Sequence, residues 1–352
     1  MSIEAPKLLE RLLRGEHLDE ATAGELLREL ARGELAPALA GALLAALRAK
    51  GETADEIRGF ARAMRELALR PAIPPGAYVD IVGTGGDGSG SLNLSTGASL
   101  LAAACGLPVV KHGNRSVSSK SGSADVLAAL GLPIPLDEAA AGACLARCGF
   151  TFLFAPHYHA ATKAIGPVRQ ALGVRTVFNI LGPLANPAAP PFHVIGAFSD
   201  KMAASMAATL AGLPLTRAFV VHGEAGWDEA TPAGPFVCYD VRPGSVVRTV
   251  RDPRDAGIER CALDDLRGAD PASNAARLRE ALAGRDTAAH RDALALNAAL
   301  ALEVTGAEPD ARSAVARARK TLASGGGSQL LERIAAFAKD HAARVATSRN
   351  QP

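Results

Sequence analysis

The 352-residue chain is poor in aromatic residues and in net charge, and both shortages limit what it can bind. Phe, Tyr and Trp make up only 4% of the residues, with a single Trp, which is too few for an extended base-stacking surface. The formal net charge at pH 7 is +2, so general attraction to a polyanion is not expected. We therefore expect no nucleic-acid partner.

Cysteine is also scarce. The chain has 5 cysteines, an odd number, and no Cys-x-x-Cys spacing. A disulfide framework or a structural zinc site is therefore not expected. Reduced, mostly buried thiols are typical of a cytoplasmic protein, and we expect that location.

Long hydrophobic runs are missing as well. The longest apolar stretches are rich in alanine and interrupted by Arg, Glu, Gly or Pro, so we expect no membrane partner. The first residues lack the basic and apolar regions of a signal peptide. Hydrophobic residues make up 48% and charged residues 21%, which is typical of a globular protein.

The pattern divides the chain in two at Pro71–Gly76, where three prolines and a glycine exclude a continuous helix. Residues 1–70 show leucines at helical spacing, and Thr53 and Glu56 have capping-box spacing, so we predict a domain of four helices. Its spare apolar face could serve as a dimer interface or pack on the rest of the chain. Helices from the middle of the chain are expected to join this domain in space.

Residues 76–346 alternate between strand and helix patterns, which predicts an α/β domain with a central, mostly parallel sheet flanked by helices. One of the expected helices covers 160–172, and 236–241 with 245–250 is expected to form an antiparallel hairpin. The other predicted strands cover 78–82, 108–111, 151–154, 193–198 and 218–221. Ligands of such sheets bind beyond the carboxyl ends of the strands.

The first polar cluster at such an end is the glycine-rich loop Gly83–Gly90. Its glycines leave the backbone N–H groups open to close approach, and the helix that follows adds its positive dipole end. These features predict a phosphate-binding loop that includes Gly83, Gly86 and Asp87. A flexible surface loop is the alternative.

The second cluster, Ser91 and Asn93–Thr96, approaches the start of that helix. Its hydroxyl and amide groups could bind the same ligand, or they could simply cap the helix. The third cluster, Lys111–Ser123, combines cations, serines and glycines after a predicted strand. This composition suits a diphosphate, with a solvated basic loop as the alternative.

The fourth cluster holds the adjacent carboxylates Asp228 and Glu229. Hard oxygen ligands of this kind suit Mg²⁺ that is held partly by a phosphorylated substrate, although adjacent acids on a loop are often only solvated. A fifth set contains His157, His159 and Arg169. Arg169 could clamp a carboxylate from the helix expected over 160–172, or it could be a surface arginine.

Five segments of the chain together resemble the signatures of the anthranilate phosphoribosyltransferase family, in order and in spacing. The resemblance runs from about residue 5 to residue 343. The segments are Gly83–Asp87, Asn93–Thr96, Lys111–Arg115, Phe178–Leu184 and Asp228–Glu229.

The resemblance implies a homodimer formed through the helical domain and an enzyme with two Mg²⁺ ions per subunit. It implies transfer of phosphoribosyl from 5-phosphoribosyl 1-diphosphate to anthranilate, in tryptophan biosynthesis. A pyrimidine nucleoside phosphorylase of the same fold, a relative with another aryl amine acceptor and a non-catalytic relative that binds nucleic acid are the alternatives. The departures from the family pattern at Ala160, Thr162 and Ala185 lie in or near the acceptor half of the site.

The resemblance also implies roles for individual residues. No residue is assigned as an acid or base, and Lys111 and Arg169 are expected to act by positioning. The metal ligands are expected to be Ser95, Asp228 and Glu229, and the anthranilate contacts Gly83, Asn114, Arg169, His112 and His159. The donor-binding positions are expected to be Gly83, Gly86, Asp87, Ser91, Asn93, Leu94, Ser95, Thr96, Lys111, His112, Gly113, Asn114, Arg115, Ser116, Val117, Ser118, Ser119 and Ser123.

Overall fold

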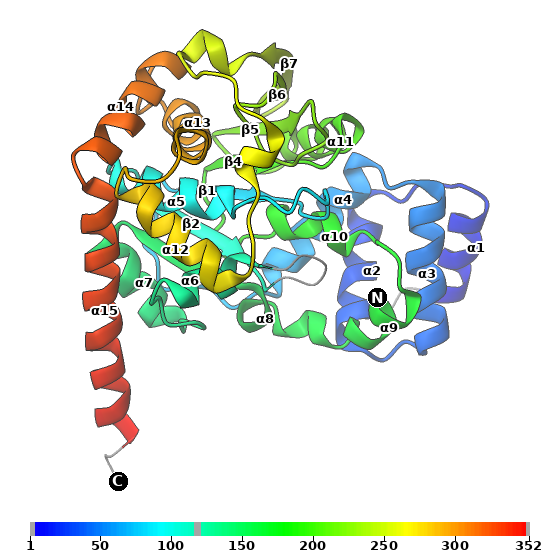
Figure 1. The fold of residues 1–352 in the computed structure, drawn as a ribbon. Helices are drawn as coiled ribbons and strands as arrows, with labels where there is room; N and C mark the ends of the chain where they lie inside the picture. Colours follow the sequence, from blue (N-terminus) through cyan, green and yellow to red (C-terminus); the bar gives the residue numbers. More distant parts are fainter. Residues whose placement is uncertain (1–3, 116–120, 350–352) are drawn as a thin grey trace.

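The computed structural model describes residues 4–115 and 121–349 and shows a small helical lobe beside a larger α/β lobe (Figure 1). This arrangement confirms the predicted fold class. The helical lobe begins with the four predicted helices, α1 (Ala5–Leu13), α2 (Glu20–Arg32), α3 (Pro37–Lys50) and α4 (Ala54–Glu66).

Local sequence explains how these helices start and how closely they pack. The Thr53 hydroxyl accepts a hydrogen bond from the Glu56 backbone, and the Glu56 carboxylate accepts one from Thr53 N, so the predicted capping box at α4 is confirmed. Helices α2 and α4 approach closely at Gly59, where a Cβ would lie 2.1 Å from the Glu20 carbonyl oxygen.

The α/β lobe is built on one seven-stranded sheet in the order β3-β2-β1-β4-β5-β6-β7. Strands β1 to β5 run parallel, and β6 and β7 form the predicted antiparallel hairpin. The strands are β1 (Val79–Gly83), β2 (Val109–Gly113), β3 (Phe150–Phe154), β4 (Phe192–Gly196), β5 (Arg217–Gly223), β6 (Phe236–Arg242) and β7 (Ser245–Arg251).

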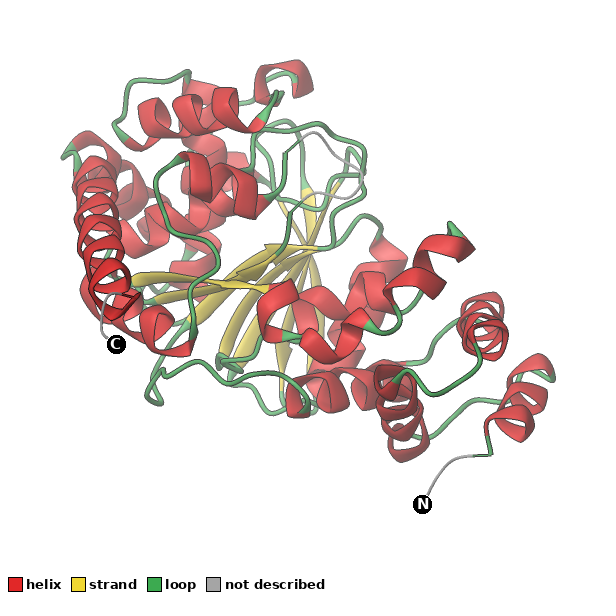
Figure 2. Ribbon diagram, turned by 90° about the horizontal axis from the view of Figure 1, so that it is seen from below, coloured by secondary structure: helices red, strands yellow, loops and turns green. Residues whose placement is uncertain are grey.

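Both faces of the sheet are covered by helices (Figure 2). Because neighbouring side chains on a strand point to opposite faces, Val194 and Phe219 join one core and Ile195 and Val220 join the other. The first core includes residues of α5 (Leu94–Ala104) and of α6 (Ser123–Ala129), α7 (Glu138–Cys148), α12 (Pro271–Leu282), α13 (Ala288–Val304), α14 (Ala311–Ala323) and α15 (Gly326–Arg349). The second core includes α11 (Asp200–Ala211) and the helical lobe, so the lobes share apolar contacts.

The single helix expected over 160–172 is wrong. The chain instead forms α8 (Ala155–Tyr158), a 3₁₀ turn (Ala160–Lys163) and α9 (Gly166–Leu172). Pro167 explains the break, because it has no N–H to donate to the carbonyl of residue 163 and it fits only the first turn of a helix. His159 and Arg169 are therefore not on one helix.

Helix α9 lies against α3 of the helical lobe (Figure 1). A Cβ added at Gly41 on α3 would touch Val168 and Leu172 of α9 at 3.6 and 3.7 Å. The chain then returns towards the sheet through residues 173–177 and the short helix α10 (Phe178–Leu181). No helix within 4–115 and 121–349 is long and apolar enough to cross a membrane.

Candidate active site

The predicted ligand-binding edge of the sheet lies where β1 meets β4. From β1 the chain continues to β2 on one side, whereas β4 pairs with the other side of β1, so this is a point where the strand order reverses. Ligands of parallel sheets bind beyond such points. The paired residues at the ends of β1 and β4 are Gly83 and Gly196.

These two glycines make room for Asp228. A Cβ on Gly83 would lie 2.4 Å from Asp228 Oδ2, and one on Gly196 would lie 1.4 Å from the Asp228 carbonyl oxygen. Any side chain at either strand end would therefore displace the segment that carries the predicted metal ligands.

The glycine-rich loop after β1 uses backbone conformations that favour glycine. Gly85 and Gly86 have φ angles of +66° and +75°, and Gly88 and Gly90 are also positive. Gly85 N donates a hydrogen bond of 2.5 Å to Asp228 Oδ2, and Asp228 N donates one of 3.3 Å to Asp87. The loop is therefore tied to the acidic segment, and one of its amides already binds a carboxylate.

Glu229 binds a second anion-binding group, the start of α5. Its carboxylate accepts hydrogen bonds from Ser95 N at 3.0 Å and from the Ser91 hydroxyl at 3.3 Å. An anion is stable there because the first N–H groups of a helix have no intrahelical partner. The two carboxylates thus lie on the loop and helix groups that the sequence assigned to a phosphorylated donor.

Asn93 precedes α5 but does not cap it with its side chain, so the simple N-cap interpretation of this residue is wrong. Its Oδ1 accepts hydrogen bonds from the Ser121 hydroxyl and from Asn274 Nδ2, each at 2.9 Å. Asn93 therefore ties the start of α5 to the polar loop after β2 and to α12. Ser121 lies within the third predicted cluster but was assigned no role. Asn274 was not predicted, and nothing local in the sequence marks it.

The acidic segment is buried and electrostatically unfavourable. Asp228 and Glu229 are only 7% and 8% exposed. Burial, with the Asp87 carboxylate nearby, raises the pKa of Asp228 to about 7. Burial, Asp228 and Asp87 raise the pKa of Glu229 well above its ordinary value.

This donor set fits Mg²⁺, since a cation would relieve the repulsion between the carboxylates. No group of three His, Cys, Asp or Glu side chains within the described ranges could hold a metal alone. That suits Mg²⁺, which commonly uses one or two carboxylates together with phosphate oxygens of a substrate.

Lys111 on β2 is buried between β1 and the start of α5. Its ammonium donates a hydrogen bond to the Ile81 carbonyl and lies 3.5 Å from the Ser95 hydroxyl. Burial lowers the pKa of Lys111 to about 8, although Asp80, Glu229 and Asp228 act in the opposite direction. The side chain therefore provides a positive charge close to the carboxylates and to the start of α5.

A second buried network supports β2. Asp80 accepts hydrogen bonds from His112 N at 3.3 Å and from Asn186 Nδ2 at 2.9 Å. Asn186 also donates to the Val110 carbonyl at 2.9 Å, so it links β1 to β2. Burial raises the pKa of Asp80 to about 6. Asn186 was missed because its partners are distant in the sequence.

His112 and His159 lie together, with ring centroids 5.0 Å apart. Burial lowers the pKa of His112 to about 3 and that of His159 to about 4, so both rings are neutral at pH 7. His112 Nδ1 lies 3.0 Å from the Gly182 carbonyl and must donate to it, which leaves Nε2 as an acceptor. The Nε2 atoms of both rings are buried and have no hydrogen-bond partner among the described residues.

The Arg169 side chain has no hydrogen bond or ion pair with another described residue. Its guanidinium lies 5.0 Å from the ring centroid of Phe178 on α10. Burial lowers the pKa of Arg169, since no carboxylate compensates for the lost water. A guanidinium in this condition is suited to an anionic ligand.

The remaining predicted positions differ in what they offer. Thr96 has a buried hydroxyl without a hydrogen-bond partner in the part of the chain that the structure describes. The Leu94 side chain belongs to the core and leaves only its backbone for a ligand. Arg115 pairs with Asp125 at 3.0 Å. Asn114 is exposed, Gly113 ends β2 and Ser123 begins α6. Ser116, Val117, Ser118 and Ser119 lie outside the described residues.

The chain matches two sequence models of one enzyme family. Residues 6–68 match the helical bundle domain of the glycosyl transferase family, and residues 76–328 match its a/b domain. An anthranilate phosphoribosyltransferase of Methylobacterium nodulans is 49% identical over 84% of this chain and 87% of its own. One from Desulforudis audaxviator is 46% identical over 94% and 95%.

Solved structures give the same result. Anthranilate phosphoribosyltransferase from Thermus thermophilus has a TM-score of 0.88 at 43% identity, covering 94% of this chain and 99% of its own. The Saccharomyces cerevisiae enzyme in complex with PRPP and Mg has a TM-score of 0.86 at 25% identity, covering 96% and 98%. These relatives do not support the nucleoside phosphorylase alternative. The chain belongs to the anthranilate phosphoribosyltransferase family.

Proposed function

We propose that this chain transfers the phosphoribosyl group of 5-phosphoribosyl 1-diphosphate (PRPP) to the amine of anthranilate. The products are N-(5-phosphoribosyl)anthranilate and diphosphate, in a step of tryptophan biosynthesis. The observation that carries the proposal is the binding of Asp228 and Glu229 to the glycine loop and to the start of α5. Backbone N–H groups suited to phosphate and carboxylates suited to Mg²⁺ therefore lie together at the ends of the strands.

The residues support a mechanism based on positioning and charge. The aryl amine of anthranilate is neutral at pH 7, so the reaction does not need a strong base to deprotonate it. The loop amides, the start of α5 and the Lys111 ammonium would bind the departing diphosphate. Fixing the amine next to the ribose carbon would supply much of the acceleration.

We propose Ser95, Asp228 and Glu229 as the ligands of two Mg²⁺ ions per subunit. When bound, Mg²⁺ stabilises the negative charge that develops on the leaving diphosphate. The support is that burial and neighbouring carboxylates raise the pKa of both carboxyls, because a bound cation would relieve this repulsion. The Ser95 hydroxyl lies 3.5 Å from the Lys111 ammonium, and the backbone N–H of Ser95 donates to Glu229, so Ser95 adjoins the same carboxylate.

Arg169 is the proposed anthranilate carboxylate ligand. We expect Arg169→Ala to raise the KM for anthranilate by about tenfold or more, because a hydrogen-bonded charge pair is lost, with little change in the KM for PRPP. Steady-state kinetics with each substrate varied in turn measures this. An equal rise in both KM values would contradict the assignment.

The direct test of the reaction follows anthranilate by its fluorescence in the presence of PRPP and Mg²⁺. We expect its consumption to require all three components. Parallel reactions with substituted anthranilates would show whether Ala160, Thr162 and Ala185 alter the acceptor range. Cleavage of uridine or thymidine by phosphate, with no consumption of anthranilate, would overturn the proposal.

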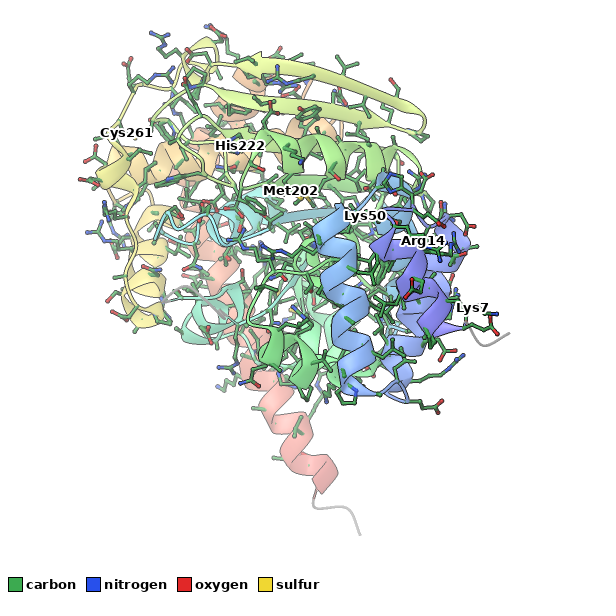
Figure 3. All side chains as sticks on the ribbon, turned by 90° about the vertical axis from the view of Figure 1, so that its right-hand side faces the viewer. Lys7, Arg14, Lys50, Met202, His222 and Cys261 are labelled. Carbon is green, nitrogen blue, oxygen red and sulfur yellow. The ribbon has the colours of Figure 1, made fainter. Side chains whose placement is uncertain are left out.

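We also propose two domains, 1–70 and 76–346, and a homodimer formed through the first. Leu13, at the end of α1, is 66% exposed, and Leu9 is only partly buried. Figure 3 shows the outer side of this lobe, with Lys7 in the first turn of α1 and Arg14 directly after its last residue. Light scattering should give twice the 36.0 kDa chain mass, and Leu13→Glu should lower the measured mass.

We expect a cytoplasmic protein, in line with its five free cysteines.

A further inference from the structure

Arg175 lies where the chain passes from the helical lobe back to the sheet. The preceding helix, α9, packs on α3, and the following helix, α10, leads towards β4. Arg175 is outside the segments that carried the family resemblance and was not among the predicted site residues. Its surroundings nevertheless bring together three separate parts of the molecule.

The Arg175 guanidinium binds the glycine loop. Its Nη2 donates a hydrogen bond of 2.5 Å to the Gly86 carbonyl oxygen. Gly86 has a φ of +75°, and a Cβ there would lie 2.5 Å from Arg175 Nη2. The missing side chain of Gly86 therefore serves two purposes, since it permits the backbone turn and admits the guanidinium.

The other contacts of Arg175 fix it to both lobes. Its guanidinium carbon lies 4.6 Å from the ring centroid of Phe198, just after β4. Its own carbonyl accepts a hydrogen bond from the Arg48 guanidinium on α3. No carboxylate among the described residues pairs with Arg175, so its charge remains available beside the loop.

We propose that Arg175 is a positioning residue for the phosphoribosyl donor. It holds the glycine loop through Gly86 while the helical lobe holds its backbone through Arg48. The loop of the donor site would thereby be connected to the helical lobe through one residue, by its side chain on one side and its backbone on the other. This inference rests on the proposed function, because it names PRPP as the ligand of the loop.

The test compares Arg175→Ala and Arg175→Lys with Arg312→Ala. Arg312 is a matched control, because it is an exposed arginine that donates to a backbone carbonyl, that of Asp255, at 2.9 Å. We expect Arg175→Ala to weaken PRPP binding by about tenfold, as expected for a lost hydrogen bond from a charged group. The KM for anthranilate should stay the same.

Arg175→Lys should recover part of the loss, because an ammonium can reach a carbonyl but cannot cover the Phe198 ring as a guanidinium does. Arg48→Ala should weaken PRPP binding in the same direction but less. Melting temperatures identify any variant that fails to fold. Calorimetric titration with PRPP and Mg²⁺, without anthranilate, gives the dissociation constant independently of turnover.

Unchanged PRPP affinity in Arg175→Ala, or an equal loss in Arg312→Ala, would overturn the inference. So would an equal rise in the KM values of both substrates. These results are distinct from failure of the proposed function, which would appear as wild-type protein that consumes no anthranilate. Calorimetry would still report on Arg175 in that case.

Discussion

Two regions of the molecule bury carboxylates, one beside a cation and the other beside further carboxylates. In the helical lobe, Glu56 is fully buried and paired with the ammonium of Lys50 at 2.8 Å. Its carboxylate also accepts hydrogen bonds from Leu18 N and Thr53 N, each at 2.8 Å. Lys50 lies at the end of α3 (Figure 3).

The carboxyl pKa values of the two regions shift in opposite directions. Burial alone would raise the pKa of Glu56, but Lys50 and the two backbone donors outweigh it and hold the pKa below its ordinary value. At the sheet edge, burial and neighbouring carboxylates leave Asp228 and Glu229 with raised pKa values. The charge of Glu56 is balanced by a neighbouring cation, whereas Asp228 and Glu229 lie beside further negative charge, as expected for the proposed Mg²⁺ ligands.

The largest expected effect comes from removing the charges of Asp228 and Glu229. Asp228→Asn combined with Glu229→Gln keeps the side-chain sizes but removes both charges. We expect Mg²⁺-dependent turnover to fall by at least about 10²-fold, because charge stabilisation of the leaving group is lost.

The same double variant should not lose stability. A raised carboxyl pKa means that ionisation opposes folding, and this cost grows as the pH rises from the unfolded-state pKa towards the folded-state pKa. In Mg²⁺-free buffer at pH 8, the melting temperature should therefore stay the same or increase. Retained turnover would remove the metal assignment, and a large drop in melting temperature would show that the pair supports the fold.

The opposite result is expected for Glu56→Gln. This change leaves the Lys50 ammonium buried without its carboxylate, which costs about 3–5 kcal/mol of the free energy of unfolding. Urea unfolding at pH 7 measures it. At temperatures where the variant remains folded, its turnover per molecule should match the wild type, because Glu56 lies in the helical lobe.

The pH dependence gives a second check on Glu56. Because its folded-state pKa is lowered, its contribution is present above the unfolded-state value of about 4.3 and is lost as the pH falls through the folded-state pKa. The stability difference between wild type and Glu56→Gln should therefore shrink on acidification. A constant difference down to pH 3 would contradict the charge argument. Lys50→Met combined with Glu56→Gln should recover part of the loss.

The comparison also shows which features local sequence encodes. The capping spacing of Thr53 and Glu56 was visible, as was the change from helical to alternating pattern at Pro71–Gly76. The glycine loop and Asp228–Glu229 were found because their residue types are unusual at strand ends. The helix break was missed, although Pro167 supplied a local signal for it.

Contacts between distant segments could not be predicted in the same way. Asn186, Asn274 and Arg175 act on groups 76 or more residues away, through hydrogen bonds that depend on the finished packing. Nor could the pattern show that Lys50 is the partner that makes Glu56 stable. Sequence identifies the chemistry of a group more readily than the geometry that holds it.

The smallest expected effect on stability tests whether burial of an ion pair, rather than a lowered carboxyl pKa, decides how much the pair stabilises the fold. Glu280 binds Arg285 through two hydrogen bonds of 2.8 and 3.0 Å, and the hydrogen bond from Arg285 lowers the pKa of Glu280, the same direction as for Glu56. However, the side chains of Glu280 and Arg285 are 51% and 66% exposed. Water and salt therefore screen the pair, and holding two long side chains together costs entropy.

We expect Glu280→Gln to leave the melting temperature unchanged within error at physiological salt, and the PRPP and anthranilate KM values unchanged as well. Repeating the melt at low salt should reveal at most a small decrease. If Glu280→Gln destabilised the protein as much as Glu56→Gln, a lowered carboxyl pKa would be enough to predict that an ion pair stabilises the fold. If only Glu56→Gln is costly, the burial of the Lys50 charge accounts for the difference, because Arg285 stays solvated when its partner is removed.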